Sequence, residues 1–386
     1  MKICHVITRL IIGGAQENTI LTCEGLAARG HDVTLISGPT DGPEGSLVER
    51  VRRGGYRFVE SPRLVRAISP VSDAAAVAEL RKLYDSIGPE IVHTHSSKAG
   101  IVGRLAAAET AVPVVVHTIH GMSFNRTQTV WMQAVFAELE RVCAARTDRI
   151  ISVANAMTLA SLAAGVGASE QYVTIYSGME VDGFDPARLD RAAARRALKV
   201  GDDRIVVATV ARLFRNKGYE QLIPAMVIAG KRAPQLHFVW IGDGADRAQY
   251  ERELDRQGLR ERTTLVGLVP PGQLPGILRG ADMLAHASLW EGLPRAVVQA
   301  LMLEIPAVCF ELDGAPEVVR TGETGVLVPP EDVAALADAM VWLAADGELR
   351  RRMGRAGRAA VLERFDWRRM VGEIESVYRD ALRRRA

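Results

Sequence analysis

The sequence predicts an α/β protein made of two doubly wound domains, each built on a parallel sheet. Short apolar runs rich in β-branched residues alternate with helical patterns, which is typical of βαβ units. The alternation stops near Ser177–Pro186, where small, polar and proline residues interrupt both periodicities, and it starts again after residue 200. We therefore expect an N-terminal domain over residues 1–180 and a C-terminal domain over residues 190–366.

The expected strands follow one another at spacings that leave room for a helix between neighbours. In the first domain they are residues 3–7, 33–37, 91–92, 114–117 and 150–153, and in the second 205–210, 236–241, 264–266, 283–287 and 307–310. A helix over 15–28, closed by Gly30, joins the first two, and the chain beyond residue 331 is largely helical. In such sheets ligands collect at the carboxyl ends of the strands, which we expect to border a cleft between the domains.

Gly13 and Gly14 follow the first expected strand and precede the first helix. Without a Cβ, the backbone there can approach a phosphate or a sugar closely. A glycine pair after a strand also fits a simple tight turn, and the full GxGxxG fingerprint is absent. The strand itself is apolar but interrupted by His5, and the segment carries no small-residue cleavage site, so we interpret it as a buried strand and not a signal peptide.

Arginines crowd residues 50–66, at Arg50, Arg52, Arg53, Arg57, Arg63 and Arg66. A solvated basic face explains such a cluster. The alternative is contact with an anionic lipid surface or an acceptor pyrophosphate, to which each base would contribute about 1 kcal/mol. Arg57, Arg63 and Arg66 are the candidates for that contact.

Four histidines lie on or beside two neighbouring strands, at His93, His95, His117 and His120. An HxH pair on one strand face is a possible pair of metal ligands. No cysteine or carboxylate ligand accompanies them, so we expect no metal and interpret His93 and His117 as core histidines. His120 stands just past a strand end before Gly121, where it can act as a neutral hydrogen-bonding group.

Arg212 and Lys217 emerge where the first strand of the second domain ends. Arginine offers a planar fork of donors and lysine a point charge, so together they can clamp one pyrophosphate. Gly242 follows the next strand, and Val266 with Gly267 ends the one after. These positions suit the floor under a nucleotide base, although ordinary turns have the same sequence.

The segment His286–Met302 predicts a strand, a short loop and a helix that begins at Pro294, because proline suits the first helical position. The first backbone N–H groups and the positive end of the helix dipole form an anion site. Glu291 would be repelled by a diphosphate, so we expect it to accept hydrogen bonds from hydroxyls nearby. Gln299 follows two turns later. The alternative interpretation is that Glu291 is a solvated acid at the start of the helix and Gln299 a surface amide.

Four separated pieces occur in one order along the chain: the Gly13-Gly14 loop, His120 with Gly121, Arg212 with Lys217, and Glu291 with the helix that follows it. In this order the sequence resembles the family 4 retaining glycosyltransferases of the GT-B fold. The likeness covers essentially the whole chain. It is greatest to bacterial members that build exopolysaccharide, capsule or lipid-linked oligosaccharides, on His-Thr-His-Ser-Ser-Lys-Ala-Gly at 93–100 and Glu-Gly-Leu-Pro at 291–294. The resemblance implies two Rossmann-like domains facing a central cleft, with 190–366 binding the donor and 1–180 the acceptor. It also implies that a final helix, 367–386, crosses back onto the first domain.

The resemblance implies a role for each piece. Arg212 and Lys217 bind the donor diphosphate, His120 holds a sugar hydroxyl near the anomeric carbon, and Glu291 contacts the transferred sugar. The donor site also includes Gly13, Gly14, Gly242, Val266, Gly267, Gly292, Leu293, Pro294 and Gln299. Gln299 stands where the family has a second glutamate that holds the ribose. An amide accepts from one hydroxyl and donates to the other oxygen, so we expect ribose binding to survive.

The implied activity is transfer of a hexose from a nucleoside diphosphate sugar, UDP-sugar favoured over GDP-sugar, to a saccharide or lipid-linked acceptor, without a metal or another cofactor. A formal net charge of +2 gives no general field for nucleic acid. Four scattered cysteines read as reduced core residues, and no apolar run is long enough to span a bilayer, so we expect a cytoplasmic protein with peripheral membrane contact at most.

Three other activities are compatible with the same residues. A binding-only subunit keeps the fold without turnover, and Gln299 is the feature in its favour. A nucleotide-sugar epimerase or a phosphorylase shares the fold with different chemistry. A metal-dependent hydrolase would use His93 and His95.

Overall fold

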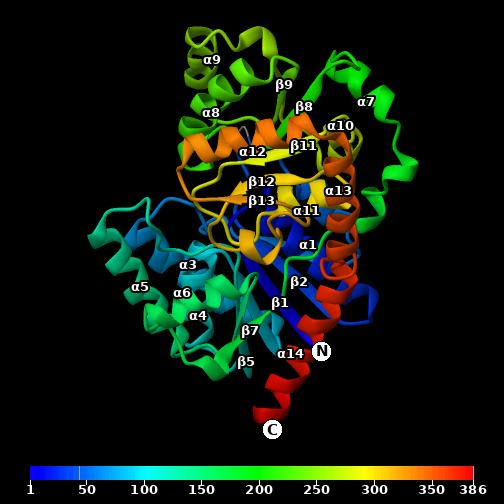
Figure 1. The fold of residues 1–386 in the computed structure, drawn as a ribbon. Coiled ribbons are helices and arrows are strands. Elements are labelled where there is room, and N and C mark those ends of the chain that lie inside the picture. The colour runs from blue at the N-terminus through cyan, green and yellow to red at the C-terminus, as the bar shows by residue number, and fades with distance from the viewer. Residues whose placement is uncertain (43, 386) are drawn as a thin grey trace. The chain divides into compact units, whose positions relative to one another are not determined.

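The computed structural model describes residues 1–42 and 44–385. Contacts divide the chain into two compact units, which are described separately below. Unit 1 comprises Met1–Met179 with Asp366–Ala386, and unit 2 comprises Glu180–Phe365. Each unit is a parallel sheet with helices packed on it, which confirms the predicted α/β fold class (Figure 1).

Unit 1 contains a parallel sheet of seven strands in the order β3-β2-β1-β4-β5-β6-β7. Its strands are β1 Lys2–Ile7, β2 Asp32–Ser37, β3 Arg57–Glu60, β4 Ile91–His95, β5 Val114–Ile119, β6 Arg149–Ser152 and β7 Tyr172–Thr174. Its helices are α1 Gly14–Ala28, α2 Val48–Arg52, α3 Pro70–Ile87, α4 Ser97–Ala107, α5 Val130–Ala144, α6 Asn155–Ala163 and α14 Trp367–Arg385. The strand order reverses between β1 and β4, which lie side by side in the sheet.

The two faces of this sheet follow the two-residue period of its strands. On one face, Ile3 and Ile7 of β1 pack with side chains of α1 and α14. On the other face, Cys4 and Val6 of the same strand pack with α3 and α4. Helices therefore cover both faces, which explains why the strands read as continuous apolar runs instead of alternating ones.

Unit 2 contains a parallel sheet of six strands in the order β10-β9-β8-β11-β12-β13. Its strands are β8 Ile205–Val210, β9 Leu236–Ile241, β10 Thr263–Gly267, β11 Met283–His286, β12 Ala307–Phe310 and β13 Gly325–Val328. Its helices are α7 Arg191–Leu198, α8 Tyr219–Arg232, α9 Arg247–Arg256, α10 Leu274–Leu278, α11 Arg295–Met302, α12 Val333–Ala345 and α13 Gly347–Val361. The strand order reverses between β8 and β11, which are again neighbours.

The chain leaves unit 1 after Met179 and returns to it at Asp366, and these two residues form a parallel bridge with each other. Helix α14 then packs on α1, where Gly25 faces Val371 closely enough that a Cβ would lie 2.7 Å from its Cγ2. The last helix of the sequence thus completes the core of unit 1 (Figure 1).

The sequence analysis did not predict three of the strands, β3, β7 and β13. Each lies at or near a sheet edge and is only three or four residues long, so its pattern is short. The prediction for the cysteines is confirmed as to burial, since Cys4, Cys23, Cys143 and Cys309 are all buried free thiols. Among the helices of the described residues, none is both long and apolar enough to cross a bilayer.

Candidate functional site

The loops after β8 and β11 meet at the point where the strand order of unit 2 reverses. In open parallel sheets ligands bind at this point, outside the carboxyl ends of the strands. Leu289 N donates to Asn216 O at 3.0 Å, so the β11 loop is hydrogen-bonded to the β8 loop. The two loops carry Lys217 and Glu291, which lie 74 residues apart in the sequence.

Glycine allows these loops to come this close. Gly218 has φ +73°, and a Cβ there would lie 1.8 Å from the carbonyl oxygen of Ala287. Gly242, with φ +140°, would place a Cβ 2.1 Å from Ala211 O in the same way. Both positions combine a left-handed backbone with contact against another loop, so a side chain at either one would push the loops apart.

Lys217 and Glu291 form the central contact of the site. Lys217 Nζ lies 2.6 Å from Glu291 Oε1, 3.3 Å from Ser288 Oγ and 3.5 Å from Trp290 O. His286 Nε2 lies 3.4 Å from the same carboxylate oxygen. The ammonium and the carboxylate are both only about one-fifth exposed, at 18% and 21% of their side-chain surface. This site therefore holds a paired cation and anion beside three further polar groups.

The electrostatics keep Glu291 ionised. Burial alone would raise the pKa of its carboxyl, but the Lys217 ammonium, with a smaller contribution from His286, outweighs burial and holds the pKa well below its usual range. Asp313, in the loop after β12, braces the backbone because its Oδ2 accepts from Glu291 N at 2.8 Å. Gly314 N donates to Gly292 O at 3.1 Å and adds a second link to that loop.

Arg212 begins the β8 loop and is exposed. Its guanidinium carbon lies 5.0 Å from the centre of the Phe214 ring, a cation–π contact that orients the side chain. Lys217 ends the 3₁₀ turn Arg215–Lys217 of the same loop. Both cations therefore lie at the carboxyl end of β8, as predicted.

Helix α11 begins one residue later than predicted. Pro294 has ψ 82°, which is not helical, so it is the N-cap and Arg295 is the first helical residue. Proline has no side-chain acceptor, so the N-cap residue gives this helix no side-chain cap. Gly292, Leu293 and Pro294 are buried, and Gln299 is half-buried in the second turn of the helix. The amide end of α11 thus follows Glu291 directly.

The glycines expected under a base lie together at one edge of the same site. Gly242 N donates to Gly267 O at 2.9 Å, which ties the ends of β9 and β10. Leu213 N donates to Asp243 O at 3.1 Å, so the loop after β9 also touches the loop that carries Arg212. Val266 is the residue before Gly267 on β10 and is half-buried.

In unit 1, Gly13 caps α1 and Gly14 is its first residue, again with no side-chain cap. The φ of 179° at Gly13 is ordinary extended backbone, so its conformation alone does not demand glycine. His120 follows β5 and is half-buried, with its Nε2 3.1 Å from His95 Nδ1. His93 and His117 are buried and hydrogen-bonded, which confirms that they are core histidines.

The basic cluster of unit 1 is largely paired. Arg50 forms two hydrogen bonds with Glu24, and Arg52 forms one with Glu49. Arg66 Nη1 lies 3.9 Å from Glu44 Oε1. Arg57, Arg63 and Arg66 are all exposed, and Arg57 lies on the edge strand β3.

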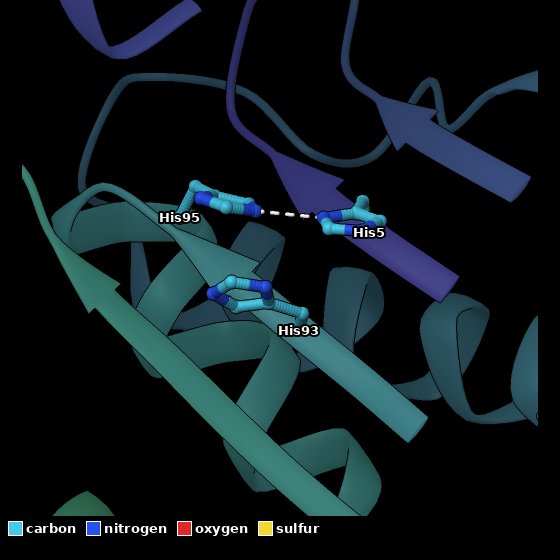
Figure 2. Close-up of side chains that lie close together, drawn as sticks. All are labelled: His5, His93 and His95. Atoms are coloured by element: carbon cyan, nitrogen blue, oxygen red, sulfur yellow. Dashed lines mark hydrogen bonds between the residues drawn. The ribbon is translucent and has the colours of Figure 1, made fainter. Parts of the chain in front are cut away.

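Sequence reasoning missed His286, Asp313 and His5. His286 lies in a segment that it treated as a strand end, and only the fold brings His286 and Asp313 to Glu291. The third, His5, joins His93 and His95 in a group in which one ring nitrogen from each residue lies within 4.8 Å of the other two (Figure 2). Parallel pairing of β1 with β4 places His5 opposite His93, a register that no local pattern reveals.

Two family models divide the chain between them. Residues 12–182 match the model described as Glycosyltransferase Family 4, and residues 190–360 match the one described as Glycosyl transferases group 1. The sequence is 29% identical to the UDP-Gal:alpha-D-GlcNAc-diphosphoundecaprenol alpha-1,3-galactosyltransferase of Escherichia coli, over 98% of this chain and 97% of that one. It is 26% identical to a GDP-mannose-dependent phosphatidylinositol monomannoside mannosyltransferase of Mycolicibacterium smegmatis, over 92% of both chains.

The structure resembles that of HepE from Anabaena, solved in complex with UDP and glucose. The TM-score is 0.83 at 21% identity, over 98% of this chain and 99% of that chain. The chain has two parallel-sheet units, and the second has a cation and a carboxylate at its switch point. Together with these matches, this defines one class of protein, the glycosyltransferases with the GT-B fold. The chain belongs to the family 4 glycosyltransferases.

Proposed function

We propose that this glycosyltransferase moves a hexose from a nucleoside diphosphate sugar to a hydroxyl of a saccharide or lipid-linked saccharide, with retention at the anomeric carbon. The observation that supports it most is the contact of Lys217 with Glu291 at the switch point of unit 2, directly before the amide end of α11. It offers an anion site and a hydroxyl acceptor side by side, as a sugar diphosphate requires.

Each group has one task in the proposed reaction. The bond between the anomeric carbon and the β-phosphate oxygen breaks, and negative charge grows on the departing diphosphate. Lys217, Arg212 and the first amides of α11 stabilise that charge. Glu291 stays ionised and accepts hydrogen bonds from hydroxyls of the transferred sugar, and in unit 1 His120 binds another hydroxyl. The acceptor oxygen bonds the same face of the carbon, and its proton passes to the departing phosphate oxygen.

The remaining residues complete the donor site in this proposal. Gly242, Val266 and Gly267 lie under the base, and Gln299 holds the ribose in place of a glutamate. Gly292, Leu293 and Pro294 lead into the amide end of α11, and Gly13 and Gly14 bring the backbone of unit 1 close to the donor. No charge in this scheme needs a metal, since two cations and a helix end already face the diphosphate.

We favour UDP-sugar over GDP-sugar as the donor, and a role in cell-surface polysaccharide or glycolipid synthesis. The Escherichia coli relative uses UDP-Gal, and HepE was solved with UDP, whereas the Mycolicibacterium relative depends on GDP-mannose. Titration calorimetry with UDP and with GDP tests the choice, and we expect tighter binding of UDP. A transfer assay with a panel of UDP-hexoses and a diphosphate-linked lipid saccharide tests the reaction, and NMR of the product shows its anomeric configuration. Formation of an epimer from donor alone, or dependence on added phosphate, would contradict it.

Arg212→Ala is expected to weaken binding of UDP about 10- to 100-fold, in line with losing a charge-assisted hydrogen bond to phosphate of about 1.5–3 kcal/mol. Calorimetry at constant salt measures it. Arg204→Ala is the control, because Arg204 is an exposed arginine before β8, at the opposite end of the same strand. Equal losses in both variants, or none in either, would remove Arg212 from the donor site.

We further propose that unit 1 contacts an anionic membrane through the outer face of α5. Val130, Trp131, Val135 and Leu139 are 83%, 67%, 50% and 38% exposed. The last three recur every four residues and form one stripe, and exposed Arg126 and Arg146 lie just before and just after the helix. Arg57, Arg63 and Arg66 are the candidates for added electrostatic attraction.

The variant Trp131→Ser/Val135→Ser is expected to lower binding to vesicles of phosphatidylglycerol at least about tenfold, because it removes two apolar anchors of about 1.5 kcal/mol or more each. Sedimentation with the vesicles measures it. Trp342→Ser is the control, since Trp342 is also exposed, at 47%, but lies on α12. If only the triple variant Arg57→Gln/Arg63→Gln/Arg66→Gln lost binding, the contact would lie on the arginine face instead.

A further inference from the structure

The histidines of unit 1 gather where β1 and β4 lie side by side. His5, His93 and His95 are fully buried, with no exposed surface. His5 pairs with His93 across the two strands, and His95 lies two residues further on the same face. Figure 2 shows the three rings close together on these strands, with His5 and His95 joined by a hydrogen bond. They face the side of the sheet that α1 and α14 cover.

The rings belong to a longer line of hydrogen bonds, which we call the histidine chain: Thr118, His93, Tyr378, His5, His95 and His120. The inner end of the histidine chain is Thr118, whose Oγ1 lies 2.7 Å from His93 Nε2. His93 Nδ1 lies 2.5 Å from the Tyr378 hydroxyl. That hydroxyl lies 3.4 Å from His5 Nε2. The outer end runs from His5 Nδ1 to His95 Nε2 at 2.9 Å, and from His95 Nδ1 to His120 Nε2 at 3.1 Å.

Each histidine ring in the histidine chain couples the bonds on its two sides. A neutral imidazole has one N–H and one lone pair, so a ring that donates through one nitrogen must accept through the other. Burial lowers the pKa of His5 to about 3 and the pKa values of His93 and His95 well below the usual range, so these rings are neutral near pH 7. The bonds from Tyr378 through His5 and His95 to His120 can therefore all run towards His120 or all run away from it.

The direction of the chain decides what His120 offers at its other nitrogen. If the bonds run towards it, His120 accepts at Nε2 and carries its proton on Nδ1. If they run away from it, Nε2 carries the proton and Nδ1 has the lone pair. A single direction gives His120 a single tautomer and fixes the plane of its ring.

We propose that the histidine chain is a positioning device, which fixes the ring and the tautomer of His120 from the C-terminal helix through Tyr378. This rests on the proposed function in so far as His120 binds a hydroxyl of the sugar. Tyr378 is the positioning residue at its centre, because its hydroxyl joins the bond from His93 to the bond from His5. The hydroxyl comes from α14, so the segment that returns to unit 1 also completes this chain.

A metal ion at His5, His93 and His95 is the competing use of the same rings. Three histidines are a common ligand set for zinc. Here, however, all six ring nitrogens of these residues have a hydrogen-bond partner, and an ion would have to displace several of those bonds. A fully satisfied hydrogen-bonded network needs no ion to compensate its buried polar groups.

Tyr378→Phe tests the proposal, because it removes one hydroxyl from the middle of the chain and leaves the ring. Histidine ¹⁵N NMR of the full-length protein reports the tautomer of each ring. We expect one tautomer at His95 and His120 in the wild type, a mixture at both in Tyr378→Phe, and kcat about tenfold lower with the donor KM within about twofold. Thr118→Val, which removes the hydroxyl at the inner end with little change of shape, is expected to shift the same signals.

Tyr84→Phe is the matched control. Tyr84 is a buried tyrosine of the same unit whose hydroxyl donates to Gly103 O at 3.4 Å, outside the histidine chain. It should leave the ¹⁵N signals and kcat unchanged. Unchanged signals at His95 and His120 in both Tyr378→Phe and Thr118→Val would overturn the proposal, as would one equivalent of zinc in the purified protein whose removal changes those signals. The NMR result stands apart from transfer activity, so failure of the proposed function would be visible separately.

Discussion

Lys217→Ala is expected to lower kcat at least about a hundredfold, the cost of removing one preorganised charge that stabilises a departing group. The ammonium lies 2.6 Å from Glu291 at the switch point of unit 2, so it is held in place before the donor binds. Because the charge on the diphosphate grows as the sugar bond breaks, the loss should fall more on kcat than on the donor KM. Steady-state kinetics with saturating acceptor measures both.

The same variant should change Glu291 in a way that is independent of catalysis. Without the ammonium, burial and not the cation dominates, so the pKa of Glu291 rises from its depressed value. A depressed carboxyl pKa contributes stability above the unfolded-state value of about 4.3 that disappears as pH falls through the folded-state value. The variant should therefore lose stability relative to the wild type at neutral pH and lose less of it near pH 3.

Lys231→Ala is the control for charge, since Lys231 lies in the last turn of α8, the helix that follows the Lys217 loop. It should leave kcat and the pH dependence unchanged. Wild-type turnover in purified Lys217→Ala would remove the lysine from the reaction, and the pH dependence would still show whether its contact with Glu291 exists in solution.

The sequence predicted the strands that lie inside the sheets better than those at the edges. β8, β9 and β12 have the predicted bounds, because buried parallel strands are short unbroken apolar runs between turn signals. β3 and β13 are edge strands of four residues, and Arg57 and Glu60 at the ends of β3 are exposed. An edge strand is specified by pairing with its neighbour, which a local pattern does not contain.

The candidate site was predictable where its residues follow strand ends. Arg212, Lys217 and Glu291 were found because polar residues after buried strands must gather at one edge of a parallel sheet. The contacts among them were not predictable in the same way. The sequence suggested two cations facing a diphosphate, and the structure shows one of them already paired with Glu291.

The residues that were missed are those whose partners lie far away in the chain. His5 and Tyr378 are separated by 373 positions, and both look like ordinary core residues of a strand and a helix. Their bonding depends on the register of β1 against β4 and on the place where α14 crosses the sheet. Periodicity predicts which face of an element is buried, but it does not tell which polar atoms meet there.

The second large effect that we expect is a loss of stability when the buried ion pair between α4 and α5 is broken. Arg104 is fully buried, and its Nη2 lies 2.5 Å from Glu140 Oε2. Its Nε donates to Gly100 O at 2.8 Å, whereas Nη1 has no hydrogen-bond partner among the described residues. Glu140→Leu leaves this guanidinium without its counter-charge, so we expect the free energy of unfolding to fall by about 3–5 kcal/mol.

In a domain of this size the loss corresponds to a fall in Tm of about 2–4 °C per kcal/mol, which scanning calorimetry resolves. Glu138→Leu is the matched control, because Glu138 lies on the same helix in an exposed pair with Arg141. Exposed pairs contribute about 1 kcal/mol or less, so its Tm should change little. Similar falls in both variants would mean that burial of the Arg104 pair has no special cost.

The double variant Arg104→Met/Glu140→Leu separates the charge from the packing. Replacing a buried pair by apolar side chains of similar volume is often neutral or stabilising, so the double variant should recover most of the stability that Glu140→Leu loses. Glu140 and His120 line the same pocket, so activity is the further readout. If stability returns but kcat does not, the carboxylate acts on the environment of His120; if both return, the pair serves only to join the two helices. A double variant as unstable as Glu140→Leu would show that the unpaired charge is not the cause.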